Sequence, residues 1–184
     1  GKRGQTGLGA TETTALPQRA NWSRKLCQQA ASVSCGAVHT AVVLVDGTLL
    51  TCGAADQGVL GQGGHNSGGD VEHLIGDAFE LSPVHSLSAA KAPVVAVSAG
   101  GTHNLALTRG SGLYAFGAGS WGRLGLGGDN KDKAIPTKVR AADHLTPIKQ
   151  VAAGHEHSVL LTGDASVFQF GRIGSSYIST PAQV

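Results

Sequence analysis

The stretch GRLGLGG, residues 122–128, follows a short apolar segment, and its glycine spacing is typical of two different kinds of loop. A glycine-rich loop can hold a phosphate group with its backbone N–H groups, or it can turn the chain where the backbone needs positive φ angles. A binding loop is needed once, whereas a turn of a repeated architecture recurs. Copies of this stretch elsewhere in the sequence would therefore identify it as a turn.

Such copies exist, because G-x-x-G-x-G occurs at residues 4–9, 58–63 and 122–127. Three further signals recur in a fixed order with it: a G-x-x-H motif, an apolar segment that closes on a glycine, and a proline before a short extended segment. The G-x-x-H motifs join Gly36 to His39, Gly100 to His103 and Gly154 to His157, the closing glycines are Gly53, Gly117 and Gly171, and the prolines are Pro17, Pro83, Pro136 and Pro181.

The intervals between copies agree for independent signals. The step from Gly4 to Gly58 equals the step from His103 to His157, and the longer step from Gly58 to Gly122 equals the step from His39 to His103. This agreement predicts tandem copies of one supersecondary unit with a ten-residue expansion in one of them.

Each unit is predicted to contain four short β-strands. The clearest copy has β-rich runs at residues 136–139, 148–153, 157–162 and 166–170, bounded by glycine, proline and polar turns, and no segment keeps a helical period. Four antiparallel strands per unit are typical of a propeller blade. The sequence therefore predicts an all-β fold, a β-propeller built of four-stranded antiparallel blades, with about three blades present as a partial ring.

The order G-x-x-H, apolar strand, closing glycine, G-x-L-G-x-G, P-x-x-V resembles the repeat of the regulator of chromosome condensation family. The resemblance covers nearly the whole chain and implies a β-propeller of about seven blades. This sequence departs from the family pattern in two ways. The usual tryptophan before the closing glycine is replaced by Cys52, Phe116 and Phe170, and the last copy lacks G-x-L-G-x-G, so that Gly171 and Pro181 are close together in the sequence.

We divide the chain accordingly. Residues 1–31 hold the end of one blade and the start of the next, residues 32–93 form a repeat with an acidic insertion at 65–81, residues 94–148 form a repeat, and residues 149–184 form a shortened one. The sequence has no methionine and begins within a loop-like segment, so we expect it to belong to something larger, held by missing blades or by other chains.

The composition excludes several classes of function. With 14 Lys and Arg against 12 Asp and Glu, the formal net charge is +2, and no basic tail favours nucleic acid. The longest aliphatic run, residues 41–45, is far too short to cross a membrane. Cys27, Cys35 and Cys52 form no C-x-x-C pair, which favours reduced thiols and an intracellular location in nucleus, cytoplasm or an organelle.

The motifs that resemble catalytic or ligand sites are better explained by architecture. Residues 117–122 match G-x-G-x-x-G by letters, but more glycine turns follow in place of a helix. His155 and His157 lack a nearby third metal ligand. We therefore predict no catalytic residue, no cofactor and no metal. The positions interpreted as structural are Gly36, His39, Gly100, His103, Gly154, His157, Gly58, Gly61, Gly63, Gly122, Gly125 and Gly127.

One insertion breaks the repeat, because the interval from Gly63 to Pro83 is about twice the interval from Gly127 to Pro136. Its acidic residues are Asp70, Glu72, Asp77 and Glu80, its apolar candidates are Leu74, Ile75 and Phe79, and it contains no Lys or Arg. The segment is either a solvated excursion or a recognition element for a protein with a basic surface, with an apolar anchor inside an acidic rim.

Two functions follow for testing. The first is a non-enzymatic scaffold for protein–protein interaction, without direct contact to nucleic acid or membrane. The alternative is implied by the resemblance, because the family includes a guanine nucleotide exchange factor for the small GTPase Ran. An exchange factor needs a surface that opens the nucleotide site of its GTPase, and the acidic insertion is the candidate segment for that role.

Overall fold

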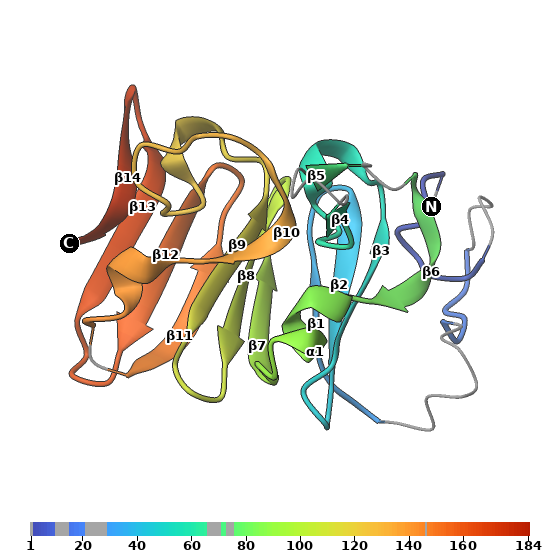
Figure 1. The fold of residues 1–184 in the computed structure, drawn as a ribbon. Helices are drawn as coiled ribbons and strands as arrows, with labels where there is room; N and C mark the ends of the chain where they lie inside the picture. The colour runs from blue at the N-terminus through green and yellow to red at the C-terminus, as the bar shows by residue number, and fades with distance from the viewer. Residues whose placement is uncertain (1, 10–14, 21–28, 66–70, 73–75, 146) are drawn as a thin grey trace.

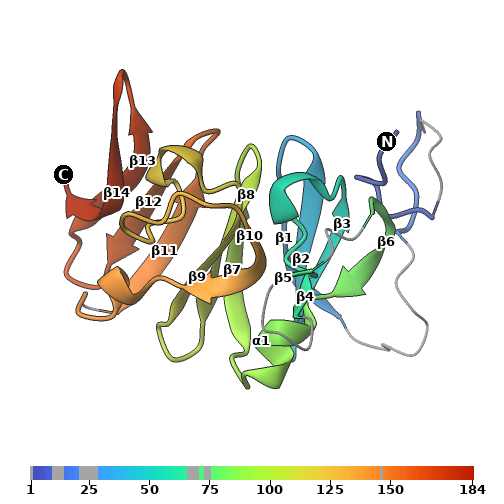
Figure 2. The same ribbon diagram turned by 45° about the horizontal axis from the view of Figure 1, so that its top comes forward.

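The computed structural model describes residues 2–9, 15–20, 29–65, 71–72, 76–145 and 147–184. The described chain contains three four-stranded antiparallel sheets that stand side by side in chain order (Figures 1 and 2). In each sheet the strands follow one another in sequence from one edge to the other. The repeat seen in the sequence is therefore a repeat of whole sheets.

The first sheet contains β1 (Ala30–Cys35), β2 (His39–Leu44), β3 (Leu49–Gly53) and β6 (Ala78–Pro83). Between β3 and β6 lie the 3-10 turn η1 (Asp56–Gly58) and a small hairpin of β4 (Gly64–His65) and β5 (Val71–Glu72). The short helix α1 (His85–Ala89) leads to the second sheet.

The second sheet contains β7 (Val94–Ala99), β8 (His103–Thr108), β9 (Leu113–Gly117) and β10 (Lys133–Lys138), with the 3-10 turn η2 (Ser120–Gly122) before β10. After the 3-10 turn η3 (Arg140–Ala142), the third sheet contains β11 (Ile148–Ala153), β12 (His157–Thr162), β13 (Val167–Ile173) and β14 (Ser176–Gln183). None of the helices in the described ranges has the length and apolar character that a membrane crossing requires.

The core lies between neighbouring sheets, and the second strands of the first two blades bury side chains on both faces. All six residues of β8 are buried, as are five of the six residues of β2. Phe116 packs in the cluster between the first and second sheets, and Phe170 packs in the cluster between the second and third. Cys52 occupies the corresponding place in the first sheet. An apolar side chain before the closing glycine thus fills each of these places instead of tryptophan.

The G-x-x-G-x-G segments are turns. Eight of their nine glycines have positive φ angles, between 65° and 82°: Gly4, Gly7, Gly9, Gly58, Gly61, Gly122, Gly125 and Gly127. The exception is Gly63, where a Cβ atom would lie 2.8 Å from the Cβ of Ala134. Each of these glycines thus has either a positive φ or a backbone position too close to its neighbour for a Cβ atom.

Two predicted strands have different bounds in the structure. The strand expected at residues 136–139 is β10 and begins at Lys133, and the strand expected at residues 166–170 is β13 and continues to Ile173. The extension of β13 has a physical cause, because the shortened connection to β14 is a hairpin that pairs Arg172 with Tyr177.

Substitution of Gly125 by valine tests the turn. Gly125 has φ +70°, and a Cβ atom there would lie 2.9 Å from the Phe170 ring, so we expect a loss of about 1–3 kcal/mol of stability or more. Gly128 is the matched control, because a Cβ atom added there would meet no atom within 4 Å. Urea denaturation of both variants measures the difference. Equal midpoints for Gly125→Val and Gly128→Val would contradict the turn assignment.

Candidate functional site

A hydrogen bond from a polar side chain to a backbone carbonyl group joins each sheet to the segment before it. The residue after each motif histidine donates a side-chain hydrogen bond to the carbonyl group that follows the first glycine of the preceding G-x-x-G-x-G turn. The three bonds are each 2.8 Å long: Thr40 Oγ1 to Gln5 O, Asn104 Nδ2 to Val59 O, and Ser158 Oγ to Arg123 O. The sequence analysis missed these residues, although a small polar side chain after each histidine was a visible signal.

Two of the motif histidines add hydrogen bonds across the interfaces between the first and second sheets and between the second and third sheets. His39 Nε2 lies 2.9 Å from Asn104 Oδ1, and His103 Nε2 lies 2.9 Å from Ser158 Oγ. Because Asn104 Oδ1 only accepts and the Ser158 hydroxyl already donates to Arg123, each histidine donates from Nε2. The Nδ1 atoms of both rings are buried and have no hydrogen-bond partner among the described residues.

Burial keeps these two histidines neutral. It lowers the pKa of His39, and it lowers the pKa of His103 to about 3, with a smaller contribution from the positive charge of Arg123. His157 occupies the corresponding position in the third sheet, where it is exposed. The geometry thus gives His39 and His103 a structural task at blade interfaces, in agreement with the structural interpretation of the motif.

The G-x-x-G-x-G turns use their own backbone groups to hold the next sheet. The third glycine of each turn donates its N–H to the outer strand of that sheet: Gly9 to Phe79 O at 2.9 Å, Gly63 to Ala134 O at 2.9 Å, and Gly127 to Ser179 O at 2.8 Å. These N–H groups therefore already have partners in neighbouring strands of the chain. GRLGLGG thus serves as a turn between blades.

The insertion begins as the β4–β5 hairpin, which pairs Gly64 with Glu72 and His65 with Val71. Asp70, Leu74 and Ile75 lie outside the described residues. Phe79 is partly buried in β6, and Glu80 beside it is exposed. Among the described recognition residues, Glu72 thus belongs to the hairpin, whereas Phe79 and Glu80 belong to the outer strand of the first blade.

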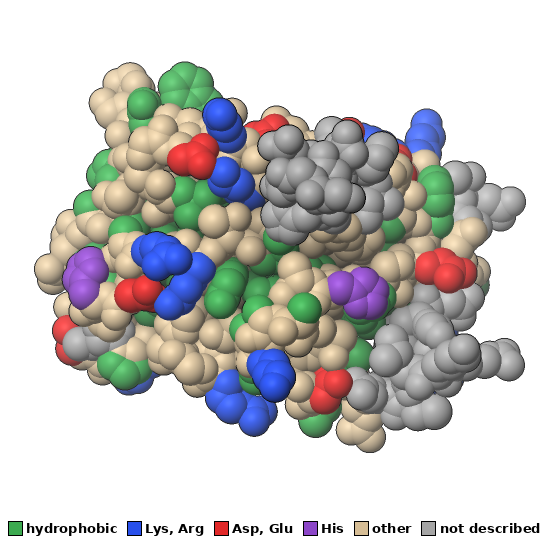
Figure 3. Space-filling model, viewed as in Figure 1, with side chains coloured by type: hydrophobic (Ala, Val, Ile, Leu, Met, Phe, Trp, Pro, Cys, Tyr) green, Lys and Arg blue, Asp and Glu red, His purple; other side chains and the backbone are tan. Residues whose placement is uncertain are grey.

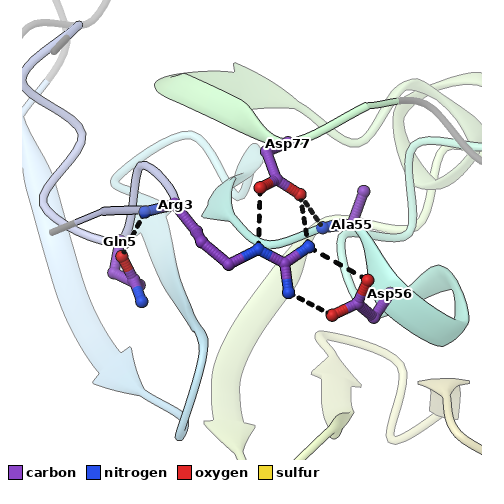
Figure 4. A network of polar contacts seen from close by, with 5 residues as sticks. All are labelled: Arg3, Gln5, Ala55, Asp56 and Asp77. Atoms are coloured by element: carbon purple, nitrogen blue, oxygen red, sulfur yellow. Dashed lines mark hydrogen bonds and ion pairs between the residues drawn. The ribbon is translucent and has the colours of Figure 1, made fainter. Parts of the chain in front are cut away.

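Asp77 takes part in a network within the chain (Figure 4). Arg3 lies between two carboxylates: its Nε donates to Asp77 Oδ2 at 2.8 Å, its Nη2 donates to Asp77 Oδ1 at 2.7 Å and to Asp56 Oδ1 at 3.0 Å, and its Nη1 also pairs with Asp56. The backbone N–H of Ala55 donates to Asp77 Oδ1 at 3.0 Å. The hydrogen bonds from Arg3 lower the pKa values of both acids.

Asp132 is the counterpart of Asp77 in the second blade. Its Oδ1 accepts the backbone N–H of Gly119 at 2.9 Å, and it directly precedes Lys133, which pairs with the closing glycine Gly117. Asp77 likewise precedes Ala78, the partner of Gly53. In both blades, an aspartate directly before the outer strand thus accepts a backbone hydrogen bond from the preceding turn. The sequence analysis did not recognise it because the insertion obscured the alignment of Asp77 with Asp132.

The described residues contain no group of three or more His, Cys, Asp or Glu side chains that could hold a metal ion. Cys35 is exposed and Cys52 is buried, and both are free thiols. Burial raises the pKa of the Cys52 thiol to about 11, which keeps it protonated and unreactive.

Solved structures share this arrangement of sheets. Human WBSCR16 superimposes with a TM-score of 0.75 at 18% identity, over 97% of this chain and 45% of that chain. Prp20p of Saccharomyces cerevisiae superimposes with a TM-score of 0.65 at 18% identity, over 89% of this chain and 40% of that chain. The predicted β-propeller of four-stranded antiparallel blades, with about three blades in this chain, is confirmed.

The regulator of chromosome condensation (RCC1) repeat matches residues 46–107 and 111–161, and the chain belongs to this family. The ultraviolet-B receptor UVR8 of Arabidopsis thaliana is 30% identical over 178 residues, which cover 94% of this chain and 37% of the receptor. The probable E3 ubiquitin-protein ligase HERC4 of Homo sapiens is 32% identical over 211 residues, which cover 92% of this chain and 20% of the ligase. The chain thus spans well under half the length of these relatives.

Acidification tests the buried histidines. The folded-state pKa of His103 is about 3, below its ordinary value of 6.5, so between these values the unfolded chain binds more protons. The free energy of unfolding should therefore fall as the pH drops from 6.5 towards 3, by up to about 1.4 kcal/mol per pH unit for each such histidine. Urea denaturation from about pH 6.5 to 4.5 avoids most carboxyl titration.

The variant His103→Asn should show a shallower loss of stability with acidification, although it is less stable overall. His157→Asn is the matched control because His157 occupies the same motif position in the third sheet and is exposed. A slope unaffected by His103→Asn would refute the assignment of this histidine as a buried neutral group.

Proposed function

We propose that this chain is a non-enzymatic protein-interaction scaffold in which the insertion before Asp77 recognises a protein with a basic surface. The observation that carries the proposal is the difference in connection length between matching blades. Thirteen residues, 64–76, separate Gly63 from Asp77, whereas four residues, 128–131, separate Gly127 from Asp132. Because the shorter connection is sufficient to complete a blade, the additional residues are free for recognition.

The charge of the insertion supports a basic partner. Asp70 and Glu72 lie in a segment without Lys or Arg, and Leu74 and Ile75 supply apolar side chains beside them. Asp77 contributes less, because its carboxylate already holds Arg3 and the backbone of Ala55. We assign recognition to residues 70–75 together with Phe79 and Glu80, in an intracellular protein without nucleic acid, membrane or cofactor as a ligand.

The exposed position of His157 supports a place in a larger assembly. Its counterparts His39 and His103 are buried by the neighbouring sheet. We infer that further blades or other chains cover the corresponding face of the third sheet, because an open sheet face of this kind favours association.

The second candidate is exchange activity on a Ran-like small GTPase. It is favoured by the likeness to Prp20p, whose structure was described together with its binding to Gsp1p and histones. The family relation is compatible with both candidates, and the scaffold is preferred because the polar groups of the repeat are used in contacts between blades.

A loop deletion tests the scaffold proposal. Deletion of residues 66–74 leaves four residues between Gly63 and Asp77, as in the second blade, so the fold should persist while binding to the protein's partners is lost. The double variant Asp70→Lys, Glu72→Lys should weaken the same partners and lessen the salt dependence of their binding.

The matched control reverses two exposed acids outside the insertion, Asp129→Lys with Asp143→Lys, and should leave binding unchanged. Quantitative pulldown at several salt concentrations measures all variants. Partners recovered equally well by the deletion variant would show that the insertion is only a spacer.

Release of labelled GDP from a Ran-like GTPase tests the second candidate. The scaffold proposal predicts that the full protein leaves the rate of GDP release at its intrinsic value. It also predicts that removal of the nucleotide does not strengthen binding between the GTPase and this protein. Acceleration of release by the full protein, lost on deletion of residues 66–74, would establish exchange activity instead.

A further inference from the structure

The shortened repeat of the third blade builds a feature that the other two blades lack. β3 and β9 end at their closing glycines, Gly53 and Gly117, but β13 continues past Gly171 to Ile173. It then turns directly into β14, pairing Arg172 with Tyr177 and Ile173 with Ser176. The loss of the G-x-x-G-x-G turn thus produces a projecting hairpin, which lies at the upper left of Figure 1.

Three side chains gather where this hairpin meets η2, and we call them the rim cluster: Trp121, Arg172 and Tyr177. The rings of Trp121 and Tyr177 meet edge to face with centroids 6.1 Å apart, and the guanidinium carbon of Arg172 lies 5.1 Å from the centroid of the Trp121 ring. At this corner Figure 3 shows hydrophobic side chains with basic and acidic side chains beside them. Trp121 remains 43% exposed and Tyr177 48% exposed.

The blade architecture does not require tryptophan at position 121. Gln57 is the matching residue in the first blade and has almost the same backbone conformation, with φ 56° against 61° for Trp121. Both residues directly precede the first glycine of a G-x-x-G-x-G turn. A polar side chain therefore satisfies this position, and the large exposed indole calls for another explanation.

Arg172 already pairs with Glu156 and donates from Nε to Gly174 O at 3.3 Å, but two guanidinium groups share this one carboxylate, which leaves an excess of positive charge beside the cluster. Glu156 is shared between two cations, because its Oε2 lies 2.9 Å from Arg172 Nη1 and its Oε1 lies 3.6 Å from Arg123 Nη2. Arg123 is buried and donates from Nε to the carbonyl group of Ser120, beside Trp121. Arg172 lies at the surface, with 45% of its side chain exposed. The Glu156 carboxylate therefore pairs with one buried and one exposed guanidinium group.

We propose that the rim cluster is a docking site for an acidic peptide segment of a protein partner. An aromatic or aliphatic side chain of the peptide packs against Trp121 and Tyr177, and a neighbouring carboxylate pairs with Arg172. Trp, Tyr and Arg are the residues most enriched at the energetic centres of protein interfaces. The site rests on the proposed scaffold function, but it lies where the second and third blades meet and selects the opposite charge from the insertion on the first.

Fluorescence anisotropy with labelled synthetic peptides tests this site on the full protein. The probe peptides carry phenylalanine or leucine between aspartate or glutamate residues. One matched set has lysine in place of the acids, and another has alanine in place of the apolar residue. We expect the acidic apolar peptides to bind about tenfold more tightly, or better, than either matched set.

Trp121→Gln places the residue of the first blade at the same turn, so it should preserve the fold while weakening binding about tenfold or more. Arg172→Gln should weaken acidic peptides and remove the salt dependence of their binding. Val95→Gln is the control, since Val95 is 47% exposed on β7, away from the rim cluster. Deletion of residues 66–74 should leave peptide binding intact, which separates this site from the insertion.

Three results would overturn the proposal: no binding by any acidic apolar peptide, equal or tighter binding by the lysine peptides, or unchanged affinity in Trp121→Gln. Loss of partner binding in the insertion variants has no bearing on this outcome. Different measurements therefore test the docking site and the insertion.

Discussion

The contact between each G-x-x-G-x-G turn and the following sheet is the interaction on which the rest of this structure depends. The turn presents one carbonyl group to the polar side chain that follows the motif histidine, and one N–H group to the outer strand. Both bonds form in each of the three interfaces. Because a buried polar group without a partner costs free energy, the two bonds fix the separation and register of neighbouring sheets.

The glycines make this contact possible for a steric reason. Gly58 lies so close to β10 that a Cβ atom would be 2.5 Å from the Cα of Ala134, and Gly122 approaches Ser179 in the same way at 2.6 Å. Positive φ angles bring the turn back towards the sheet within one short segment. The high glycine content of the chain thus follows from the close approach of its blades.

The binding sites that we propose lie where the repeat changes, because the repeated polar groups form hydrogen bonds with each other. The first blade has a longer connection with acidic residues, and the third has a shorter connection that forms a hairpin with an exposed aromatic and basic cluster. Both changes leave the contacts between blades intact. A propeller of this kind can vary its surface loops without loss of its core.

The sequence by itself determined the repeat, the four strands of each blade, the turn function of GRLGLGG and the family, because these depend on periodic local signals. It also predicted an insertion, through the longer interval between Gly63 and Pro83. Only the tertiary structure showed that Asp77 holds Arg3, and that Trp121 lies against Arg172 and Tyr177. These contacts join residues that are far apart in the chain, and such pairings are set by the packing of whole sheets rather than by any local pattern.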